Sequence, residues 1–425
     1  SINNRECKLN VGIIGAGISG IAAAQELHLK HKVTLVDSED SIGGHSHTIK
    51  VNDGTNIDTG FIVYNDRNYP GFSAFLEALG VKSSRTSMSF SYSENNLKLE
   101  YAGTIQGLFP RFRTLMDRGH IGLMWSIYKY SRKLNNLKFA DLEKNCSVVQ
   151  LLKTIGCPDQ TIEKYFLPIA SAIWSCDANN VRDIPANTFI RFFSNHGLFN
   201  ITNRPKWYSI DNGSRAYLEA FRKNFSGTIL TETRAVSCFE MSDKVVIKGE
   251  NDKHYEFDVV LLATPADKSN SIFGSTDKKI NSILSSYTYT SNRVVLHMDT
   301  DFMPANRRLW ASWNFISHSN GRRGTKTFVS YYMNQLQNLI TKIPYFVTLN
   351  PPWDPKSDKI IFDTAYNHPM LTHDEETNEM NFNELNTKAR VYFCGSYLGY
   401  GFHEDGFSSG VKAAKLIDLR KLISS

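Results

Sequence analysis

The stretch that decides the fold is "LNVGIIGAGISGIAAAQELHLKHKVTLVDSED", which runs from Leu9 to Asp40. A short apolar run leads into "GAGISG" (residues 15–20), and an alanine-rich helical stretch follows. A second apolar run then ends at Asp37. This order predicts a βαβ unit that carries a dinucleotide-binding fingerprint, and therefore a Rossmann-like domain.

Each part of the fingerprint has a physical role. Gly15 permits the tight turn, Gly17 leaves room for a pyrophosphate, and Gly20 lets the helix pack closely on the strand. The helix N-terminus offers free N–H groups to the phosphates. Asp37, where the second strand ends, can accept hydrogen bonds from a ribose. An acid here disfavours a 2′-phosphate, which leaves NAD or FAD as the ligand.

A second glycine pair follows the acid. Gly43 and Gly44 precede His45, and "NIDTGFIVYN" then places Asp58 and Gly60 a few residues further on. A chain that must pass along an extended cofactor needs small residues at such a point. An ordinary turn would also use them, and the residues alone leave both interpretations open.

Near the C-terminus, "FCGSYLGYGFHEDGFSSG" (Phe393 to Gly410) contains five glycines. It follows a short apolar run, 390–393, and precedes a segment in which apolar residues recur at helical spacing. We expect a strand, a glycine-dense loop and a helix. The loop is either a tight turn with a helix cap or a surface that a ligand approaches closely.

The middle of the chain has a different texture. Aromatic and basic residues interleave in "LFPRFRTLMDRGHIGLMWSIYKYSRKL" (Leu108 to Leu134), and residues 87–203 are expected to be mostly helical. Two interpretations stay open: a helical cap with a solvated basic face, or an apolar and basic surface that meets a membrane or a long acyl substrate. Further on, the near-continuous apolar run Val259–Leu262 predicts a buried parallel strand.

Composition excludes several classes. The 425 residues carry 48 cations and 42 anions, scattered along the chain, so nucleic acid binding is not expected. The six cysteines are far apart without CxxC spacing, which argues against a zinc site or a disulfide framework. No apolar run is long enough to span a membrane. We expect a cytoplasmic protein and leave peripheral membrane contact and oligomeric state open.

Together, the glycine turn, "IGGH", "DTGFIVYN", "LLATP" and "YFCGSYLGYGFHEDGFSSGVKAA" resemble the flavin-containing amine oxidase superfamily. More narrowly, they resemble a branch of NAD/FAD-binding oxidoreductases found beside, or fused to, cyclopropane-fatty-acid synthases. The resemblance covers nearly the whole chain. It implies an α/β fold with two interwoven domains, as in amine oxidases: a Rossmann-like FAD-binding domain (1–86, 204–267 and 388–425) and an α+β substrate or cap domain (87–203 and 268–387).

The resemblance further implies a non-covalently bound, extended FAD, because no cysteine is placed for the covalent link known in some members. The N-terminal turn would hold the pyrophosphate, and the C-terminal loop would meet the flavin ring. The expected cofactor-binding residues are Gly15, Ala16, Gly17, Ile18, Ser19, Gly20, Asp37, Ser38, Gly43, Gly44, His45, Thr59, Gly60, Phe61, Ile62, Val236, Ala263, Gly395, Ser396, Asp405, Gly406 and Phe407.

The chain also departs from the amine oxidase pattern. His45 stands where an arginine is usual, and the lysine that contacts the flavin through water is missing; alignment by eye puts Arg293, or its neighbour Asn292, in that region. An always-charged guanidinium cannot replace lysine in proton handling. We expect His403 and Arg293 as catalytic candidates, while helix-start polarity is the alternative explanation for His403.

His45 and His47 have a spacing found in metal sites, but no further ligand cluster accompanies them, so no metal is expected. The leading hypothesis is an FAD-dependent oxidoreductase that transfers a hydride from substrate to flavin N5, with a fatty acyl lipid as the favoured substrate. The alternatives are an amine oxidase acting on a small amine, a redox-neutral fatty acyl isomerase, and a non-catalytic flavin-binding partner of a lipid-modifying enzyme.

Overall fold

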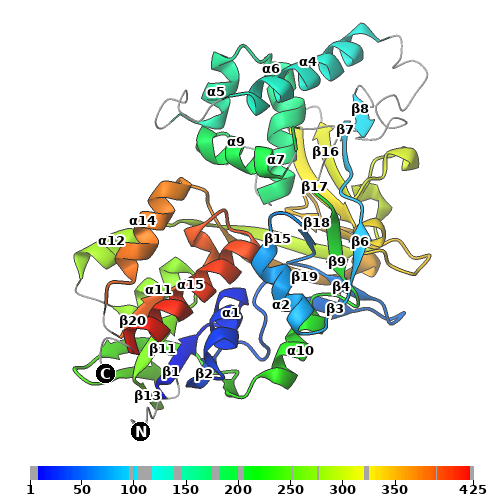
Figure 1. The fold of residues 1–425 in the computed structure, drawn as a ribbon. Helices are drawn as coiled ribbons and strands as arrows, with labels where there is room; N and C mark the ends of the chain where they lie inside the picture. Colours follow the sequence, from blue (N-terminus) through cyan, green and yellow to red (C-terminus); the bar gives the residue numbers. More distant parts are fainter. Residues whose placement is uncertain are drawn as a thin grey trace.

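The chain divides around two sheets. The computed structural model describes residues 8–94, 99–102, 117–137, 146–174, 181–196, 198–199, 205–250, 252–274, 277–319, 325–388 and 390–421. Its strands form a parallel sheet, a larger mixed sheet and three small sheets. Figure 1 places the parallel sheet near the two termini and a group of helices at the opposite end of the molecule, with the mixed sheet between them.

The parallel sheet contains the first strands of the chain and the last one. Its order is β10-β2-β1-β14-β20, formed by β1 (Asn10–Ile14), β2 (Lys32–Val36), β10 (Thr228–Leu230), β14 (Val259–Leu262) and β20 (Val391–Phe393). The strands expected around "VGII", "VTLV" and "VVLL" are confirmed. All four residues of β14 are buried, because parallel strands are covered on both faces.

Two separate apolar cores cover the faces of this sheet. Ile13 and Leu261 belong to one core, and their neighbours Ile14 and Leu262 belong to the other. This alternation follows from the two-residue period of a strand. The first core also holds α1 (Ile18–Leu27) and α15 (His403–Lys421). The second lies under β11–β13 and the helices α11, α12 and α14.

The elements around the second core are β11 (Ala235–Glu240), β12 (Val245–Gly249), β13 (His254–Phe257), α11 (Ala266–Phe273), α12 (Lys278–Ser286) and α14 (Glu375–Leu385). Strands β11 to β13 form a three-stranded antiparallel sheet. Two further helices belong to this half of the molecule, α2 (Pro70–Ala78) and α10 (Arg215–Asn224).

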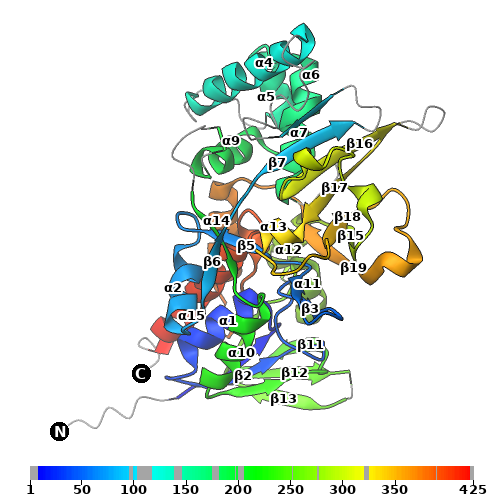
Figure 2. The ribbon, with the colours of Figure 1, turned by 90° about the vertical axis from the view of Figure 1, so that its right-hand side faces the viewer.

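Helices α1 and α15 approach each other through glycine. A Cβ added to Gly410 would lie 2.1 Å from the backbone oxygen of Ser19, and one added to Gly406 would lie 2.8 Å from Cγ2 of Ile18. Side chains at these positions would force the helices apart. The glycines therefore let the start of the chain and its end lie side by side, as Figures 1 and 2 show.

The mixed sheet has seven strands in the order β19-β15-β18-β17-β16-β7-β8. They are β7 (Phe90–Glu94), β8 (Glu100–Ala102), β15 (Tyr289–His297), β16 (Trp313–Ser319), β17 (Thr325–Tyr332), β18 (Phe346–Leu349) and β19 (Ile360–Pro369). Neighbouring strands are antiparallel except β16 and β7, which are parallel. The exact boundaries of the two expected domains stay a prediction.

The helical group lies beyond this sheet (Figure 2). It comprises α4 (Arg118–Asn135), α5 (Val148–Thr154), α6 (Asp159–Thr161), the π-helix η3 (Ile162–Phe166), α7 (Leu167–Trp174) and α9 (Ala186–Asn195). Residues 108–116 of the helical stretch expected from the sequence lie outside the described ranges. In the part of the chain that the structure describes, no helix has the length and apolarity needed to cross a bilayer.

Small sheets and the buried carboxyl group of Asp58 connect the part of the molecule around the parallel sheet with the part around the mixed sheet. The remaining elements are β3 (Thr48–Lys50), β4 (Asn56–Asp58), β5 (Val63–Asn65), β6 (Ser83–Thr86), β9 (Trp207–Ile210) and α13 (Met333–Leu336). Asp58 accepts hydrogen bonds from the amide of Ser214, at the start of α10, and from the amide group of Gln337. Burial raises the pKa of Asp58 to about 6, against the opposing effect of the hydrogen bonds from Thr48 and Ser214.

The glycine contact between α1 and α15 gives a stability prediction. Gly410→Ala places a methyl group against the Ser19 carbonyl, and we expect a loss of about 1–3 kcal/mol of unfolding free energy from overpacking. Gly122→Ala, in the exposed face of α4, is the matched control, because its added Cβ would meet no atom within 4 Å. That control should gain about 0.5–1 kcal/mol, as glycine is a poor helix former. Urea unfolding of both variants measures the difference, and equal effects would contradict the packing argument.

Candidate flavin site

In the glycine turn before α1, one of the three glycines has free space where a side chain would lie, and the other two do not. Gly15 has a φ of 102°, and a Cβ added there would lie 2.7 Å from the Ala263 oxygen. A Cβ added to Gly20 would lie 1.9 Å from the Gly15 oxygen, so strand and helix pack directly together. A Cβ added to Gly17 would meet nothing within 4 Å. The space in front of Gly17 is therefore free of protein atoms, as the expected phosphate group requires.

The helix behind this space has no cap of its own. Gly17 is the N-cap residue of α1, and no side chain accepts a hydrogen bond from the first turn. The N–H groups of Ile18 and Ser19 therefore lie at an uncapped helix N-terminus, which favours an anion. These observations fit the pyrophosphate of FAD, so the residues present match the cofactor that the sequence predicts.

Asp37 is tied to the same turn. Its Oδ2 accepts a hydrogen bond from the amide of Ala16 at 2.6 Å, and its Oδ1 accepts one from the amide of Glu39 at 2.9 Å. The carboxylate is thereby fixed where β2 ends, next to the first glycine turn. Ser38 follows it at an exposed position. This is the geometry expected of a ribose acceptor.

The second glycine pair lies against the first turn. Gly44 has a φ of 58°, and its added Cβ would lie 3.2 Å from the Cα of Gly17. The amide of Gly43, whose φ is 132°, donates to the oxygen of Ala16 at 2.9 Å. Both residues adopt a backbone conformation that side chains disfavour. The sequence interpretation of an ordinary isolated turn is therefore too simple, because the two turns form one surface.

The segment after the second pair continues beside it. The amide of Phe61 donates to the His45 oxygen at 2.8 Å, and a Cβ at Gly60 would lie 2.0 Å from the same oxygen. Thr59 is buried and shares a hydrogen bond with the hydroxyl of Tyr366 at 2.8 Å. Ile62 packs against the core of the mixed sheet. These residues thus form the passage from the nucleotide end toward the second half of the molecule.

The C-terminal loop completes the surface. Gly406 faces Ile18 and Ser19 of α1, and a Cβ there would also lie 3.5 Å from the Cβ of Ser396. The amide of Gly395 donates to Oγ of Ser409 at 3.0 Å, which fixes the start of the loop. The expected convergence of the first glycine turn and the C-terminal glycine loop is therefore present in the structure.

Two expected cofactor contacts are restricted to the backbone. The ring of Phe407 packs in the core with Phe72 and Phe75 of α2, so its side chain serves packing. Val236 lies at a register shift between β11 and β12, where a bulge leaves one residue without a facing partner. Its backbone groups could therefore meet a ligand, which stays a prediction.

Three histidines surround the predicted flavin end. The ring of His45 stacks on His368 of β19 at 5.4 Å between centroids, with an interplanar angle of 6°. His403, at the start of α15, stacks on Phe61 at 3.8 Å and shares a hydrogen bond with the hydroxyl of Tyr217 at 3.1 Å. Burial lowers the pKa of each of the three, to about 3 for His368 and His403, and the charge of His45 adds to the effect on both.

His45 has two properties that most side chains do not combine. It is exposed to water, yet protein atoms surround it closely enough to lower its pKa. Asp405 is similar, because it is partly exposed while burial raises its pKa to about 7. Water reaches both side chains although protein atoms lie close around them. We infer that the flavin ring binds in the space beside them.

Arg293 does not belong to this space. It is 40% exposed, and its guanidinium pairs with Asp363 and Asp354, at 2.6 Å in each case. Its neighbour Asn292 is buried and donates to Nδ1 of His368 at 2.9 Å. Successive residues of β15 point to opposite faces, so Asn292 reaches the site and Arg293 reaches solvent. The catalytic role expected for Arg293 is contradicted by this geometry.

Glu404 is also used elsewhere. Its two carboxylate oxygens accept hydrogen bonds from the amides of Gly71 and Phe72, at 2.9 and 2.8 Å, and so cap the N-terminus of α2. Asp405 accepts from the amide of Phe402 at 2.8 Å. Glu404 therefore serves to cap α2. Among the described residues, no group of three His, Cys, Asp or Glu side chains is arranged to hold a metal ion.

The sequence analysis missed His368 and Asn292 as a pair. They come from β19 and β15, which are neighbours in the sheet but 76 residues apart in the chain. A period-two pattern places Tyr366 and His368 on one face of β19, while Asp363 lies on the other. This alternation along the strand was the signal available in the sequence. Once the pairing of β15 with β19 is known, the same alternation places Asn292 and Arg293 on opposite faces of the sheet.

Two glycine turns, an acid at a strand end and a second helix start that meet on one surface define a dinucleotide-binding oxidoreductase fold. Comparison with protein-family models matches residues 18–333 to "Flavin containing amine oxidoreductase". The chain belongs to this family. The expected FAD-dependent oxidoreductase, its FAD cofactor and the amine-oxidase-like α/β fold are confirmed; non-covalent attachment stays a prediction.

Solved structures share the fold at low identity. Cyclohexylamine oxidase from Brevibacterium oxydans IH-35A is 14% identical with a TM-score of 0.70, and the match covers 99% of this chain and 100% of that one. A CLA-producing fatty acid isomerase from P. acnes is 14% identical with a TM-score of 0.66, covering 99% of each chain. Wild-type putrescine oxidase bound to putrescine is 12% identical with a TM-score of 0.66, covering 97% of this chain and 99% of that one. No curated protein matches the chain.

The open position at Gly17 gives the first site prediction. Gly17→Ala should fold with unchanged stability, because the added methyl meets no protein atom. It should nevertheless weaken FAD binding by about tenfold or more, since the methyl enters the space assigned to the phosphates. Titration of the FAD-free protein, followed by quenching of flavin fluorescence, measures the affinity. Retained affinity in a stably folded variant would show that the phosphates lie elsewhere.

The low pKa of His403 gives a second prediction. With a pKa near 3 in the folded protein, His403 stays unprotonated between about pH 3 and pH 6.5, whereas in the unfolded chain it takes up a proton in this range. Protonation therefore favours the unfolded chain, and the unfolding free energy falls as pH falls. Between pH 7.5 and pH 5, the wild type should lose about 2 kcal/mol more unfolding free energy than His403→Gln, which keeps a hydrogen-bonding side chain. Urea unfolding at both pH values tests this. The exposed His254→Gln serves as control and should keep the wild-type dependence.

Proposed function

We propose that this flavoenzyme oxidises a fatty acyl substrate by hydride transfer, in the branch associated with cyclopropane-fatty-acid synthases. FAD, when bound, supplies the hydride acceptor at N5 of its ring. The chain's own residues shape the space beside that ring. His45, His368 and His403 are neutral near pH 7, since burial lowers the pKa of each. These three side chains are uncharged and suit an apolar substrate.

An aromatic cluster continues from these histidines. Phe402, which directly precedes His403, stacks on Phe192 of α9 at 4.9 Å, and its ring lies 6.5 Å from that of Trp174 at the end of α7. These side chains belong to, or pack against, the core of the helical group. A long hydrocarbon chain would bury apolar surface against them. The cluster therefore supports an acyl substrate that extends from the flavin end into the helical group.

The observation that carries the proposal is a pair of buried indole N–H groups. Nε1 of Trp174 and Nε1 of Trp313 are inaccessible to water, and no described residue accepts a hydrogen bond from either. The Trp174 ring belongs to the core of the helical group, and the Trp313 ring packs against that core. An indole N–H only donates, so a substrate that reaches either group on binding must present an acceptor such as a carboxyl or ester oxygen. An ammonium group, which also only donates, would leave both unsatisfied.

The residues also indicate how protons are held. His403 is fixed by Tyr217, whose hydroxyl shares a second hydrogen bond with Oγ of Ser46 at 2.6 Å. His368 is fixed by Asn292, and Asn292 in turn accepts from Asn350 at 2.8 Å. Because Nδ1 of His368 accepts from the Asn292 amide, the neutral ring of His368 carries its proton on Nε2 and can donate a hydrogen bond from there. His403, fixed by Tyr217, keeps its other ring nitrogen for a second hydrogen bond. We assign to these two imidazoles the positioning of the proton that the missing lysine would handle in amine oxidases.

The experiment is anaerobic reduction of the FAD-loaded protein, followed at the flavin absorption band. Loss of the oxidised band with fatty acids or their esters, and not with small amines, is the expected result. Bleaching by amines alone would overturn the acyl assignment in favour of an amine oxidase. An acyl product of unchanged mass would indicate an isomerase instead. A flavin that stays oxidised with every compound would leave only a non-catalytic binding role.

A conservative variant tests the indole donors. Trp313→Phe keeps an aromatic ring and removes the N–H, so the dissociation constant of the reactive fatty acid should rise about 5- to 10-fold, the size of one hydrogen bond. The rate of flavin reduction at saturation should change by less than about twofold, since the group only positions the substrate. Trp310→Phe is the control, because its N–H already donates to the Pro304 oxygen at 2.8 Å. Equal effects of the two variants would contradict the assigned contact.

A further inference from the structure

The outer face of helix α4 carries apolar and basic side chains together. Ile121, Trp125 and Tyr128 are 44%, 64% and 41% exposed. They are three or four residues apart and so lie on one side of the helix. The cations of the helix are Arg118, Lys129, Arg132 and Lys133, all exposed, and its sequence contains no Asp or Glu. We refer to Ile121, Trp125, Tyr128, Lys129, Arg132 and Lys133 as the α4 face.

The opposite side of α4 anchors it to the helical group. Leu123 and Leu134 are buried. The hydroxyl of Tyr130 donates to the Gly156 oxygen at 2.5 Å, and Oγ of Ser126 shares a hydrogen bond with Thr161 at 2.7 Å. Because these contacts fix the helix from beneath, the α4 face is presented outward on a firm support.

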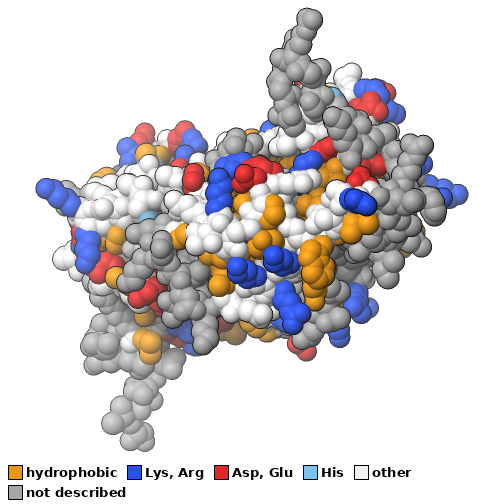
Figure 3. Space-filling view, turned by 90° about the horizontal axis from the view of Figure 1, so that it is seen from above, with side chains coloured by type: hydrophobic (Ala, Val, Ile, Leu, Met, Phe, Trp, Pro, Cys, Tyr) orange, Lys and Arg blue, Asp and Glu red, His pale blue; other side chains and the backbone are white. Residues whose placement is uncertain are grey.

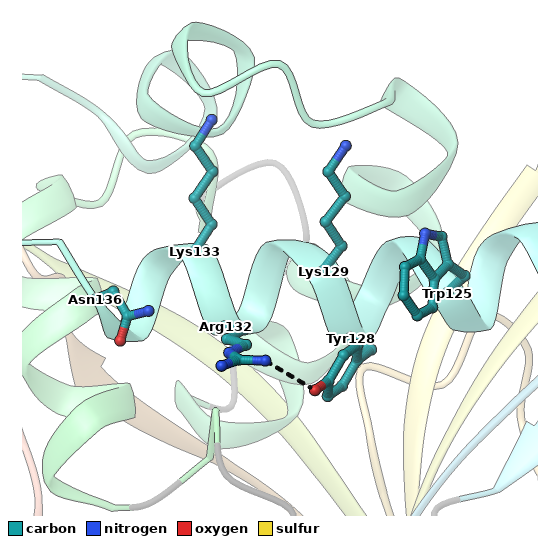
Figure 4. A pocket seen from close by; sticks show the side chains of 6 residues that line it. All are labelled: Trp125, Tyr128, Lys129, Arg132, Lys133 and Asn136. Carbon is teal, nitrogen blue, oxygen red and sulfur yellow. Dashed lines mark hydrogen bonds between the residues drawn. The ribbon is translucent and has the colours of Figure 1, made fainter.

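The α4 face is a ridge with only a shallow hollow. Residues of the face and Asn136 line this hollow of about 320 Å³. Figure 4 shows Lys129 and Lys133 extending to one side of the helix, while Arg132 donates to the hydroxyl of Tyr128 at 3.3 Å. Seen from above in Figure 3, hydrophobic and basic side chains gather on this end of the molecule. Helix α4 also lies at the opposite end of the molecule from α1 and β1 in Figure 1.

Among the described residues, the acids near α4 leave this positive charge largely uncancelled. Asp117 is the N-cap of α4 and accepts from the amide of Gly119 at 2.8 Å. Glu163 is held by Arg182 at 2.6 Å, and Asp159 lies 4.0 Å from Lys153. The last two acids are thus paired with cations that are not part of the α4 face. The net field of this surface favours an anionic partner.

We propose that the α4 face binds the surface of an anionic lipid bilayer. Trp and Tyr are amphipathic rings that suit the headgroup level, and Lys and Arg bury their apolar stems while their charged ends meet lipid phosphates. A fluid bilayer can bind an exposed ridge because it needs no shaped groove. A folded acidic protein or a nucleic acid fits such a ridge less well. This inference goes beyond the proposed function and does not rest on the substrate.

The test is co-sedimentation of the FAD-loaded protein with lipid vesicles. One set is phosphatidylcholine alone, and in the other about a third of the lipid is phosphatidylglycerol. We expect binding to the anionic vesicles at about 0.1 M salt and much weaker binding at about 0.5 M, because salt screens surface charge. Absence of binding to anionic vesicles at low salt, or equal binding to both lipids, would overturn the proposal.

Charge variants localise the contact. The double variant Lys129→Glu and Arg132→Glu should lower the affinity for anionic vesicles by about tenfold or more, since each basic residue near the surface contributes measurably. Arg222→Glu with Lys223→Glu, exposed on α10 at the other end of the molecule, makes the same change in net charge and is the control. Equal losses in both variants would mean that only net charge matters and would refute the α4 face.

Insertion of the aromatic side chains has its own readout. Vesicles with brominated acyl chains should quench part of the protein's tryptophan fluorescence, and Trp125→Phe should remove most of that quenching while keeping the binding. Leu29→Ala, which shortens another exposed apolar side chain, should change neither signal. Unchanged quenching in Trp125→Phe would show that another surface meets the lipid. Self-association through α4, seen as a concentration-dependent size that vesicles do not compete with, would also refute the proposal.

Discussion

The contact on which the structure most depends is the close approach of α1 and α15. Gly410 leaves no room for a side chain against the Ser19 carbonyl, and Gly406 sits against Ile18. This contact brings the helix start that faces the nucleotide next to the loop that faces the flavin ring. The two parts of an extended cofactor site are otherwise almost 400 residues apart. The close packing of these two helices is therefore what brings the parts of the site together.

The local parts of the fold could be predicted from sequence because their signals are local. Gly15, Gly17 and Gly20 lie between two apolar runs, and each glycine has a geometric reason that needs no distant partner. The choice between Asn292 and Arg293 could not be made, because one residue along a strand reverses the face and the pairing of β15 with β19 was unknown. The capping of α2 by Glu404 likewise depends on a contact between segments 332 residues apart.

The flavin end differs in character from an exposed polar cleft. Its three histidines are neutral near pH 7, and its carboxyl groups Glu404 and Asp405 accept from backbone amides. Asp405 accepts from the amide of Phe402, so this carboxyl group lies at the edge of the apolar cluster. That cluster packs in the core of the helical group, to which α4 also belongs. The acyl substrate and the bilayer contact that we propose would therefore both involve the helical group.

The cap that Glu404 places on α2 has a consequence for biosynthesis. The side chain that satisfies the first amides of α2 comes from α15, which is made more than 300 residues later. The parallel sheet likewise waits for β20, the last of its strands in sequence order. A growing chain on the ribosome must therefore hold its amino-terminal elements incomplete until α15 has been made. Chaperones that shield exposed apolar surface have their greatest opportunity to act during that interval.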